Sequence, residues 1–450
     1  MEVATGDDVT LGGLLWTNEG TEEPFTLRAT GEGFIVSETS GTATKILLQQ
    51  CEGIGCGMKV RCGDWHGMLG RAGNPVGIST ARELPLAPKL TELKSEFRDI
   101  ALPGKKITSV ASRWSGFVVG TSDGEVVFFD AGRCESWRSK VSGAILSLEI
   151  SPEGVVVGEE SGALTLFDHT GRRCWTVEIP WVSLPWSNWS ECRSRIREIA
   201  CADINGDGRD EILISNADRR VYAFDCEGRE LWKRPIQWGV FTAMWPGVHE
   251  GSQVLLGGTS RPSIHGYVVL LNGDGSVRGQ IKRADLVCWG LPANLRDLQQ
   301  ADIDGDGHIE TITAVDANCR QLIAYGADGV VKWDCDVGAC AVALVFNPML
   351  RQIYVTSEAG YVVAVNGNTG QRAWVAWIGE TAELVWTLPD GRVVVVAQRG
   401  VVWMFLPTGE IQGRIDLGEP ITAIPRPGNH RGPGRRFIIG TTSGRVLTLD

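Results

Sequence analysis

Short apolar stretches alternate with glycine-rich turns along most of the chain. One seven-residue pattern, rich in β-branched and aromatic residues and bounded by Gly, Asp or Asn, occurs eight times. Its copies begin 38 to 57 residues apart, close to the length of a four-stranded propeller blade. This alternation is typical of short antiparallel strands. The copies are 124–130, 162–168, 219–225, 266–272, 320–326, 360–366, 400–406 and 444–450.

A second apolar strand precedes each copy, and most copies are followed by a glycine turn and a strand that opens on tryptophan. We expect these tryptophans to pack blade against blade, because they recur at equivalent places. They are Trp137, Trp175, Trp232, Trp333 and Trp374.

The eighth copy reaches Asp450 without a following outer strand. Residues 97–110 have the pattern of the outer-to-inner junction at 413–424, so residues 96–102 are expected to supply that strand. Closure of this kind removes exposed sheet edges. The sequence therefore predicts an all-β protein: an eight-bladed β-propeller over residues 95–450 and a small β-rich domain over residues 1–94. Seven or nine blades would follow if one repeat were misread or amino-terminal strands joined the ring.

Two nearly identical acidic loops lie 99 residues apart. Alternate oxygen-bearing side chains, a glycine at the sixth position and a carboxylate at the ninth suit calcium, which takes six to eight oxygen ligands. We expect one calcium in each loop, structural rather than catalytic; the alternative is a solvated acidic turn. The expected ligands are Asp203, Asn205, Asp207, the carbonyl of Arg209 and Glu211 in the first loop, and Asp302, Asp304, Asp306, the carbonyl of His308 and Glu310 in the second.

The strand–Asp-x-x-Gly–x-x-Trp rhythm resembles the propeller repeats of the quinoprotein (PQQ-like) superfamily. The acidic loops resemble the calcium loops of integrin-type FG-GAP propellers. WD40 repeats fit less well, because Trp333–Asp334 is the one Trp-Asp pair in the sequence. The adjacent cysteine pair of quinoprotein dehydrogenases is missing, which places that activity in doubt.

A cysteine and histidine cluster lies within the first domain. Cys51, Cys56, Cys62 and His66 have the spacing C-x4-C-x5-C-x3-H, and zinc takes four such ligands. Zinc would help a small domain to fold. Unmetallated thiols and an iron–sulfur or redox centre stay open as alternatives.

Tryptophans in the long junctions between blades are the expected partner-binding residues. Outer-to-inner junctions all emerge on the face opposite the acidic loops, and exposed Trp near Arg is typical of interface hot spots. The alternative is that these rings cover the channel or neighbouring blades. They are Trp181, Trp186, Trp189, Trp238 and Trp289.

Charge and composition narrow the function. The net charge of −11 argues against general binding to nucleic acid or to anionic membranes. Apolar runs are too short for a transmembrane helix, and the acidic start has no secretory signal. Of the 12 cysteines, nine are scattered from Cys134 to Cys340 and suggest reduced, mostly buried thiols in a cytoplasmic protein.

The function expected from these observations is a non-catalytic protein–protein interaction scaffold, a subunit of a cytoplasmic assembly. No H-E-x-x-H metalloprotease motif and no phosphate-binding loop is present in the sequence. The alternatives are a propeller enzyme acting on carbohydrate or a redox substrate, and a calcium-responsive ligand sensor.

Overall fold

The computed structural model describes residues 97–449 apart from 114–115, 181–193, 237–239, 250–251, 261–266, 283–294, 316–320, 338–339 and 426–434. Before residue 97 it describes only the backbone of ten strands. All regular structure in these parts is β.

The amino-terminal strands form two sheets, in the orders β1-β4-β5-β6 and β2-β3-β10-β9-β8-β7. Residues 80–96 fall outside the described part, so the domain boundary at residue 94 stays a prediction. The strands are β1 (Glu2–Val3), β2 (Asp8–Leu11), β3 (Leu14–Asn18), β4 (Phe25–Thr30), β5 (Gly33–Glu38), β6 (Ala43–Leu47), β7 (Glu52–Ile54), β8 (Gly57–Cys62), β9 (Trp65–Arg71) and β10 (Gly77–Ser79).

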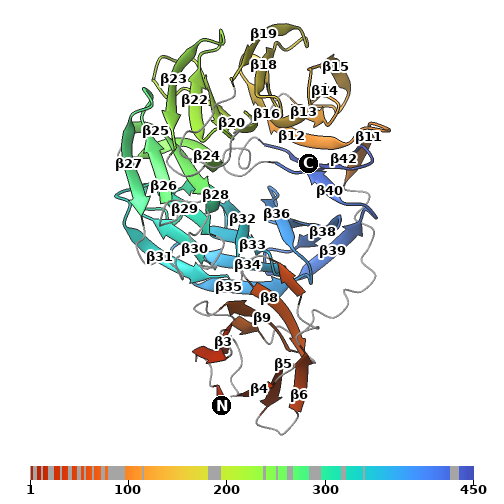
Figure 1. The fold of residues 1–450 in the computed structure, drawn as a ribbon, viewed down its shortest axis with the longest axis vertical. Helices are drawn as coiled ribbons and strands as arrows, with labels where there is room; N and C mark the ends of the chain where they lie inside the picture. Colours follow the sequence, from red (N-terminus) through yellow and green to blue (C-terminus); the bar gives the residue numbers. More distant parts are fainter. Residues whose placement is uncertain are drawn as a thin grey trace.

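The rest of the chain forms eight four-stranded antiparallel sheets arranged in a ring (Figure 1). In blades 1 to 7 the chain runs from the innermost strand outward, whereas blade 8 takes its outermost strand from the amino-terminal end of the propeller. Blade 1 comprises β12 (Ile107–Arg113), β13 (Gly116–Thr121), β14 (Glu125–Asp130) and β15 (Glu135–Lys140), and blade 2 comprises β16 (Ile145–Ser151), β17 (Gly154–Glu159), β18 (Ala163–Phe167) and β19 (Arg173–Glu178). Blade 3 comprises β20 (Ile196–Ala202), β21 (Glu211–Asn216), β22 (Arg220–Phe224) and β23 (Glu230–Pro235). Blade 4 comprises β24 (Val240–His249), β25 (Ser252–Ser260), β26 (Tyr267–Leu271) and β27 (Val277–Lys282).

Blades 5 to 8 repeat this order. Blade 5 comprises β28 (Leu295–Ala301), β29 (Glu310–Val315), β30 (Gln321–Tyr325) and β31 (Val331–Asp336), and blade 6 comprises β32 (Ala341–Asn347), β33 (Gln352–Ser357), β34 (Tyr361–Asn366) and β35 (Arg372–Trp377). Blade 7 comprises β36 (Ala382–Thr387), β37 (Val393–Ala397), β38 (Val401–Phe405) and β39 (Ile411–Asp416). Blade 8 comprises β40 (Ile421–Ala423), β41 (Phe437–Thr441), β42 (Arg445–Leu449) and β11 (Arg98–Ala101).

The predicted closure of the ring is confirmed. Strand β11 pairs antiparallel with β42, with Arg98 opposite Thr448 and Ala101 opposite Arg445. The two ends of the propeller therefore complete one sheet, and β11 lies beside β42 in Figure 1. The eight-bladed count predicted from the repeats is confirmed as well.

The core is divided among the interfaces between blades. The described residues form eight apolar clusters, each joining two neighbouring blades around the ring. Burial of apolar surface drives this packing. The repeat-position tryptophans take part: the indole N–H of Trp175, Trp232, Trp333 and Trp374 donates to a carbonyl in the next blade's outer turn at 2.7–2.9 Å.

Two irregularities in the strand pairing recur from blade to blade. The pairing of the innermost strand with the second strand shifts register near its start in all eight blades. The outer strand shifts likewise in blades 1 to 7. Each shift is a β-bulge, which leaves one extra residue whose side chain is re-aimed.

Candidate functional site

The first acidic loop connects β20 to β21 in blade 3 and is folded around Asp203. The carboxylate of Asp203 accepts hydrogen bonds from the backbone amides of Gly206, Asp207 and Gly208 at 2.7–3.2 Å. Both glycines have positive φ, at 82° and 88°, which is where glycine is favoured. The glycines of the motif therefore allow the turn that wraps this carboxylate.

Glu211 closes the first loop from its buried end. Glu211 is only 3% exposed. Its carboxylate accepts hydrogen bonds from the Ile204 backbone amide at 2.9 Å and from the Asn205 side-chain amide at 2.6 Å. Burial raises the pKa of Glu211, partly offset by the Ile204 hydrogen bond. The loop thus holds a carboxylate in an environment that disfavours its charge.

The second acidic loop connects β28 to β29 in blade 5 and repeats this geometry. Asp302 accepts hydrogen bonds from the amides of Gly305 and Gly307 at 2.5 and 3.2 Å. Glu310, only 1% exposed, accepts one from the Ile303 amide at 3.1 Å. Repetition of the motif therefore gives repetition of the backbone fold.

A lysine distinguishes the second loop. The Lys332 ammonium lies 2.5 Å from Asp304, 3.0 Å from Glu310 and 3.7 Å from Asp306. Carboxylate oxygens of Asp302, Asp304 and Glu310 lie within 4.8 Å of one another, close enough to share one cation. In this loop the lysine supplies positive charge to the cluster.

The bulge in the outer strand brings this lysine to the loop. Trp333 pairs with Ala324 and Val331 with Tyr325, so Lys332 is the extra residue. The same bulge in blade 3 has Leu231 as its extra residue, next to the equivalent Trp232. The first loop therefore has an exposed leucine where the second has a cation.

The lysine also changes the ionisation of the second loop. Its hydrogen bond lowers the pKa of Asp304. Partial burial opposes the charge on Lys332, but the hydrogen bonds to Asp304 and Glu310 outweigh burial and raise the pKa of Lys332. Both partners are held in their charged forms.

Exposed apolar side chains lie on the same face as the acidic loops. Arg351, in the inner loop of blade 6, donates to the Asp304 carbonyl and so ties the second loop to its neighbour. In that same inner loop, Met349 is 80% exposed. The other exposed apolar side chains on connections or strand ends of this face are Leu231, Val248, Val277, Ile309, Val330 and Leu350.

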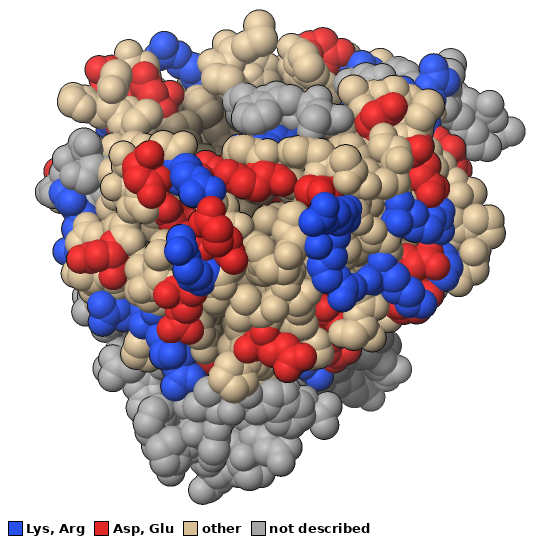
Figure 2. Space-filling model, turned by 90° about the horizontal axis from the view of Figure 1, so that it is seen from above, with Lys and Arg blue, Asp and Glu red and all other residues tan. Residues whose placement is uncertain are grey.

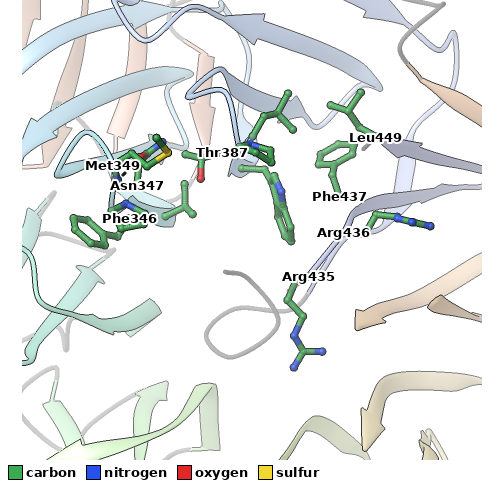
Figure 3. Close-up of a pocket in the computed structure, with 13 residues that line it drawn as sticks. Phe346, Asn347, Met349, Thr387, Arg435, Arg436, Phe437 and Leu449 are labelled. Carbon is green, nitrogen blue, oxygen red and sulfur yellow. Dashed lines mark hydrogen bonds between the residues drawn. The ribbon is translucent and has the colours of Figure 1, made fainter. Parts of the chain in front are cut away.

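A cavity of about 430 Å³ opens beside Met349, between blades 6, 7 and 8 (Figure 3). Met349 and Asn347 lie on one side, Phe437 and Leu449 lie on the other, and Thr387 lies between them. The buried Trp386 also lines the cavity. The cavity is large enough for apolar side chains of a partner.

One ion pair at the edge of this cavity joins three blades. The Arg435 guanidinium donates to both carboxylate oxygens of Glu149 at 2.7 and 3.2 Å, and to the Ser112 carbonyl at 2.7 Å. Glu149 is fully buried, so the pair neutralises a charge inside the ring. Sequence reasoning missed this pair because its members are 286 residues apart.

The surface carries both signs of charge. Figure 2 shows Lys and Arg interleaved with Asp and Glu on the side of the ring seen there. Nowhere in the described part of the chain does a helix long and apolar enough to cross a membrane occur.

Several predicted residues cannot be placed. The tryptophans expected to bind a partner lie in or next to inter-blade junctions outside the described residues. Cys51 and Cys56 also lie outside them, whereas Cys62 ends β8 and His66 lies on the adjacent β9. The zinc site and the tryptophan surface therefore stay predictions.

The thiol expectation needs one correction. Five described cysteines are not part of a disulfide, and three of them are buried. Cys340, however, is bonded in a disulfide, so the prediction of reduced thiols throughout was wrong at this position. The sequence shows no spacing that distinguishes this cysteine from the others.

Together these features define the class of protein: an eight-bladed β-propeller with two acidic loops on one face. The family model described as the lambda-carrageenase β-propeller domain matches residues 154–244, less than half of the chain. Among curated proteins, none matches the sequence.

Solved structures with the same fold include BamB from Moraxella catarrhalis, at 17% identity and a TM-score of 0.53, covering 78% of this chain and 95% of that one. Sqt1 from Saccharomyces cerevisiae has 11% identity and a TM-score of 0.59, covering 78% and 97%. The computationally designed protein Ika8 has 15% identity and a TM-score of 0.56, covering 77% and 96%. At these identities the likeness concerns the fold alone.

Proposed function

We propose that this protein is a non-catalytic interaction scaffold, a subunit of a multiprotein assembly, that binds a protein partner on the acidic-loop face. The observation that carries the proposal is the exposed Met349 beside an apolar cavity of about 430 Å³. Exposed apolar surface next to a cavity is typical of interaction sites. Because Arg435 is already paired with Glu149, the partner is expected to insert an apolar side chain.

The test is purification of the tagged protein with calcium retained, followed by mass spectrometry and by reconstitution with the purified partner. We expect a stoichiometric partner that Met349→Lys releases. Val277→Lys, at an exposed apolar position of the same face but in blade 4, away from the cavity between blades 6, 7 and 8, is the matched control and should retain the partner. If both variants retain the partner equally well, the partner does not bind on this surface.

The tryptophan surface is tested in the same experiment. Substitution of Trp181, Trp186 and Trp189 by alanine distinguishes the two faces. Loss of the partner in this variant, with retention by Met349→Lys, would place binding on the opposite face while leaving the scaffold function intact. A purified protein with no partner under any condition would overturn the scaffold proposal.

We further propose that each acidic loop binds one calcium ion, as the FG-GAP resemblance implies. The donor set fits, since it consists of carboxylates, one amide and a backbone carbonyl. In the first loop the Asn205 amide would present its oxygen to the ion. In the second loop calcium would displace Lys332. Calcium titration of the metal-free protein tests this, and no uptake would reject it.

A structural zinc at Cys51, Cys56, Cys62 and His66 is proposed on its spacing and tested by metal analysis of the purified protein. A cytoplasmic location is likewise proposed from the sequence. Disulfides are rare in the cytoplasm, so the disulfide at Cys340 favours an oxidising compartment instead. Cell fractionation with thiol labelling decides between a reducing and an oxidising compartment.

A carbohydrate-active enzyme is the second candidate function. The match of residues 154–244 to a carrageenase-type propeller supports it. Its test is release of reducing ends from carrageenans and other polysaccharides by the purified protein. Turnover that is lost with the fold but unaffected by Met349→Lys would favour this candidate over the scaffold.

A further inference from the structure

The eight inner-strand bulges surround one cavity. In each blade the register shift leaves one extra residue near the start of the inner strand, at its second position in seven blades and at its third in blade 4. All eight of these residues line a cavity of about 480 Å³ at one mouth of the central channel, a volume typical of small-molecule sites. In blade order they are Thr108, Leu146, Arg197, Thr242, Arg296, Val342, Glu383 and Thr422.

The threonines of this ring are explained by the fold. Thr242 and Thr422 donate their hydroxyls to the Leu295 and Ile107 carbonyls of the next blade, the latter at 2.6 Å. Thr108 donates within its own blade to the Gly120 carbonyl at 3.3 Å. These bonds satisfy carbonyls at the inner edges of the sheets.

The carbonyls at the inner edges of the sheets do not require the charged members of the ring, which are Arg197, Arg296 and Glu383. Arg197 belongs to blade 3 and Arg296 to blade 5, and Arg195 lines the same cavity. Arg195 pairs with Glu160 at 2.9 Å, and Arg296 lies 3.8 Å from Glu358. Arg197 is exposed and has no ion pair within the described residues. Two of these guanidinium groups therefore lie on the blade 3 side of the ring, and that of Arg296 comes from blade 5, midway between blades 3 and 7.

A carboxyl stands on the other side. Glu383 belongs to blade 7, opposite blade 3 in a ring of eight. Burial raises the pKa of Glu383, while Arg296 opposes the shift. A raised pKa weakens the negative charge that this residue sets against an incoming anion. Glu198 also lines the cavity and is buried.

We propose that this channel mouth is a binding site for a small ligand that carries an oxyanion, either a carboxylate or a sulfate group. Planar guanidinium groups bind such anions through paired N–H donors. Arg197 is the main residue that contacts the anionic group, and Arg296 is the second. The Glu383 carboxyl repels ligands that carry a large negative charge. The cavity lies on the face opposite the acidic loops, so this site is independent of the proposed partner surface and calcium sites.

The test is calorimetric titration of the full chain with inorganic sulfate, galacturonate, galactose 6-sulfate and galactose at constant ionic strength. We expect at least one anion to bind ten times more tightly than neutral galactose. The carboxylate and sulfate arms identify which group is preferred. The proposal is overturned if every anion binds no better than galactose.

Variants locate the binding. Arg197→Ala should weaken anion binding at least tenfold, Arg197→Lys should restore part of it, and Glu383→Gln should strengthen it. Arg229→Ala removes an exposed arginine from the opposite face and should leave affinity unchanged. Retained melting transitions show that the variants fold. Equal anion affinity in wild type, Arg197→Ala and Glu383→Gln would place any binding elsewhere and overturn the assignment.

Discussion

The two acidic loops have almost the same sequence and the same backbone hydrogen bonds, yet different charges surround them. In the first loop Glu211 is bonded to two amides. In the second loop Glu310 is bonded to an amide and to the Lys332 ammonium. The motif therefore fixes how the loop folds, whereas a residue from the outer strand decides how its charge is balanced.

This difference has a functional consequence for the proposed calcium sites. A carboxylate cluster without a cation repels itself and gains most from a metal ion. A cluster that already holds an ammonium must exchange it. We therefore expect the first loop to bind calcium more tightly than the second.

The largest expected effect comes from removing the lysine. Lys332→Met should lower the free energy of unfolding of the metal-free protein by about 2–3 kcal/mol, because the buried Glu310 loses its cation. Urea unfolding with chelator or with calcium measures this, and calcium should restore most of the loss. Lys233→Met, at an exposed lysine paired with Glu230, should change stability by less than about 1 kcal/mol. Equal losses in both variants would mean that the lysine does not balance the cluster.

Moving the lysine to the first loop tests the comparison in the other direction. Leu231→Lys should place an ammonium beside Glu211 and weaken calcium binding there about tenfold, which corresponds to about 1.4 kcal/mol. Calorimetric titration measures the affinity of this variant. Leu231→Met, which changes shape without adding charge, serves as control. Unchanged affinity in Leu231→Lys would show that the bulge positions are not equivalent.

Acidification should affect the first loop in a predictable direction. Because the pKa of Glu211 is raised, protons compete with calcium as the pH falls towards that pKa, and the apparent affinity decreases by up to about tenfold per pH unit below it. Calcium titrations between pH 7 and pH 4, which include the ordinary pKa of 4.5 for a glutamate side chain, measure this. Glu211→Gln should bind more weakly and lose most of the dependence. A constant affinity over this range would contradict the raised pKa.

The smallest effect concerns the link between the second loop and blade 6. Arg351→Ala removes the hydrogen bond to the Asp304 carbonyl and should cost about 0.5–1 kcal/mol, because the arginine is exposed. Thermal unfolding measures the change. Arg209→Ala, which removes an exposed ion pair with Glu227 at the first loop, should change stability less. A larger loss from Arg209→Ala would reverse the expected order.

Much of the fold could be predicted because propeller repeats are local. Strand alternation, turn glycines and the tryptophan positions all lie within about 45 residues of one another, and each blade repeats them. Closure by residues 96–102 was predictable too, since the last repeat lacked an outer strand. The acidic loops were found because their ligand spacing is written in consecutive residues.

The features that the sequence did not reveal depend on bulges and on contacts between distant segments. Lys332 reaches the second loop from 22 residues away, and only the register shift re-aims it. The one signal that could have found it is the comparison of the residues before Trp232 and Trp333, leucine and lysine. Arg435 and Glu149 meet only because the ring closes.

The sequence by itself determined the number of blades, their order, the closing strand and the fold of the two acidic loops, because each depends on local periodicity and turn chemistry. The tertiary structure alone decided which loop receives a cation, which side chains line the channel mouth, and where an apolar cavity opens beside exposed methionine. These depend on how bulges direct single side chains and on which blades become neighbours, and neither is encoded in the spacing of any one repeat.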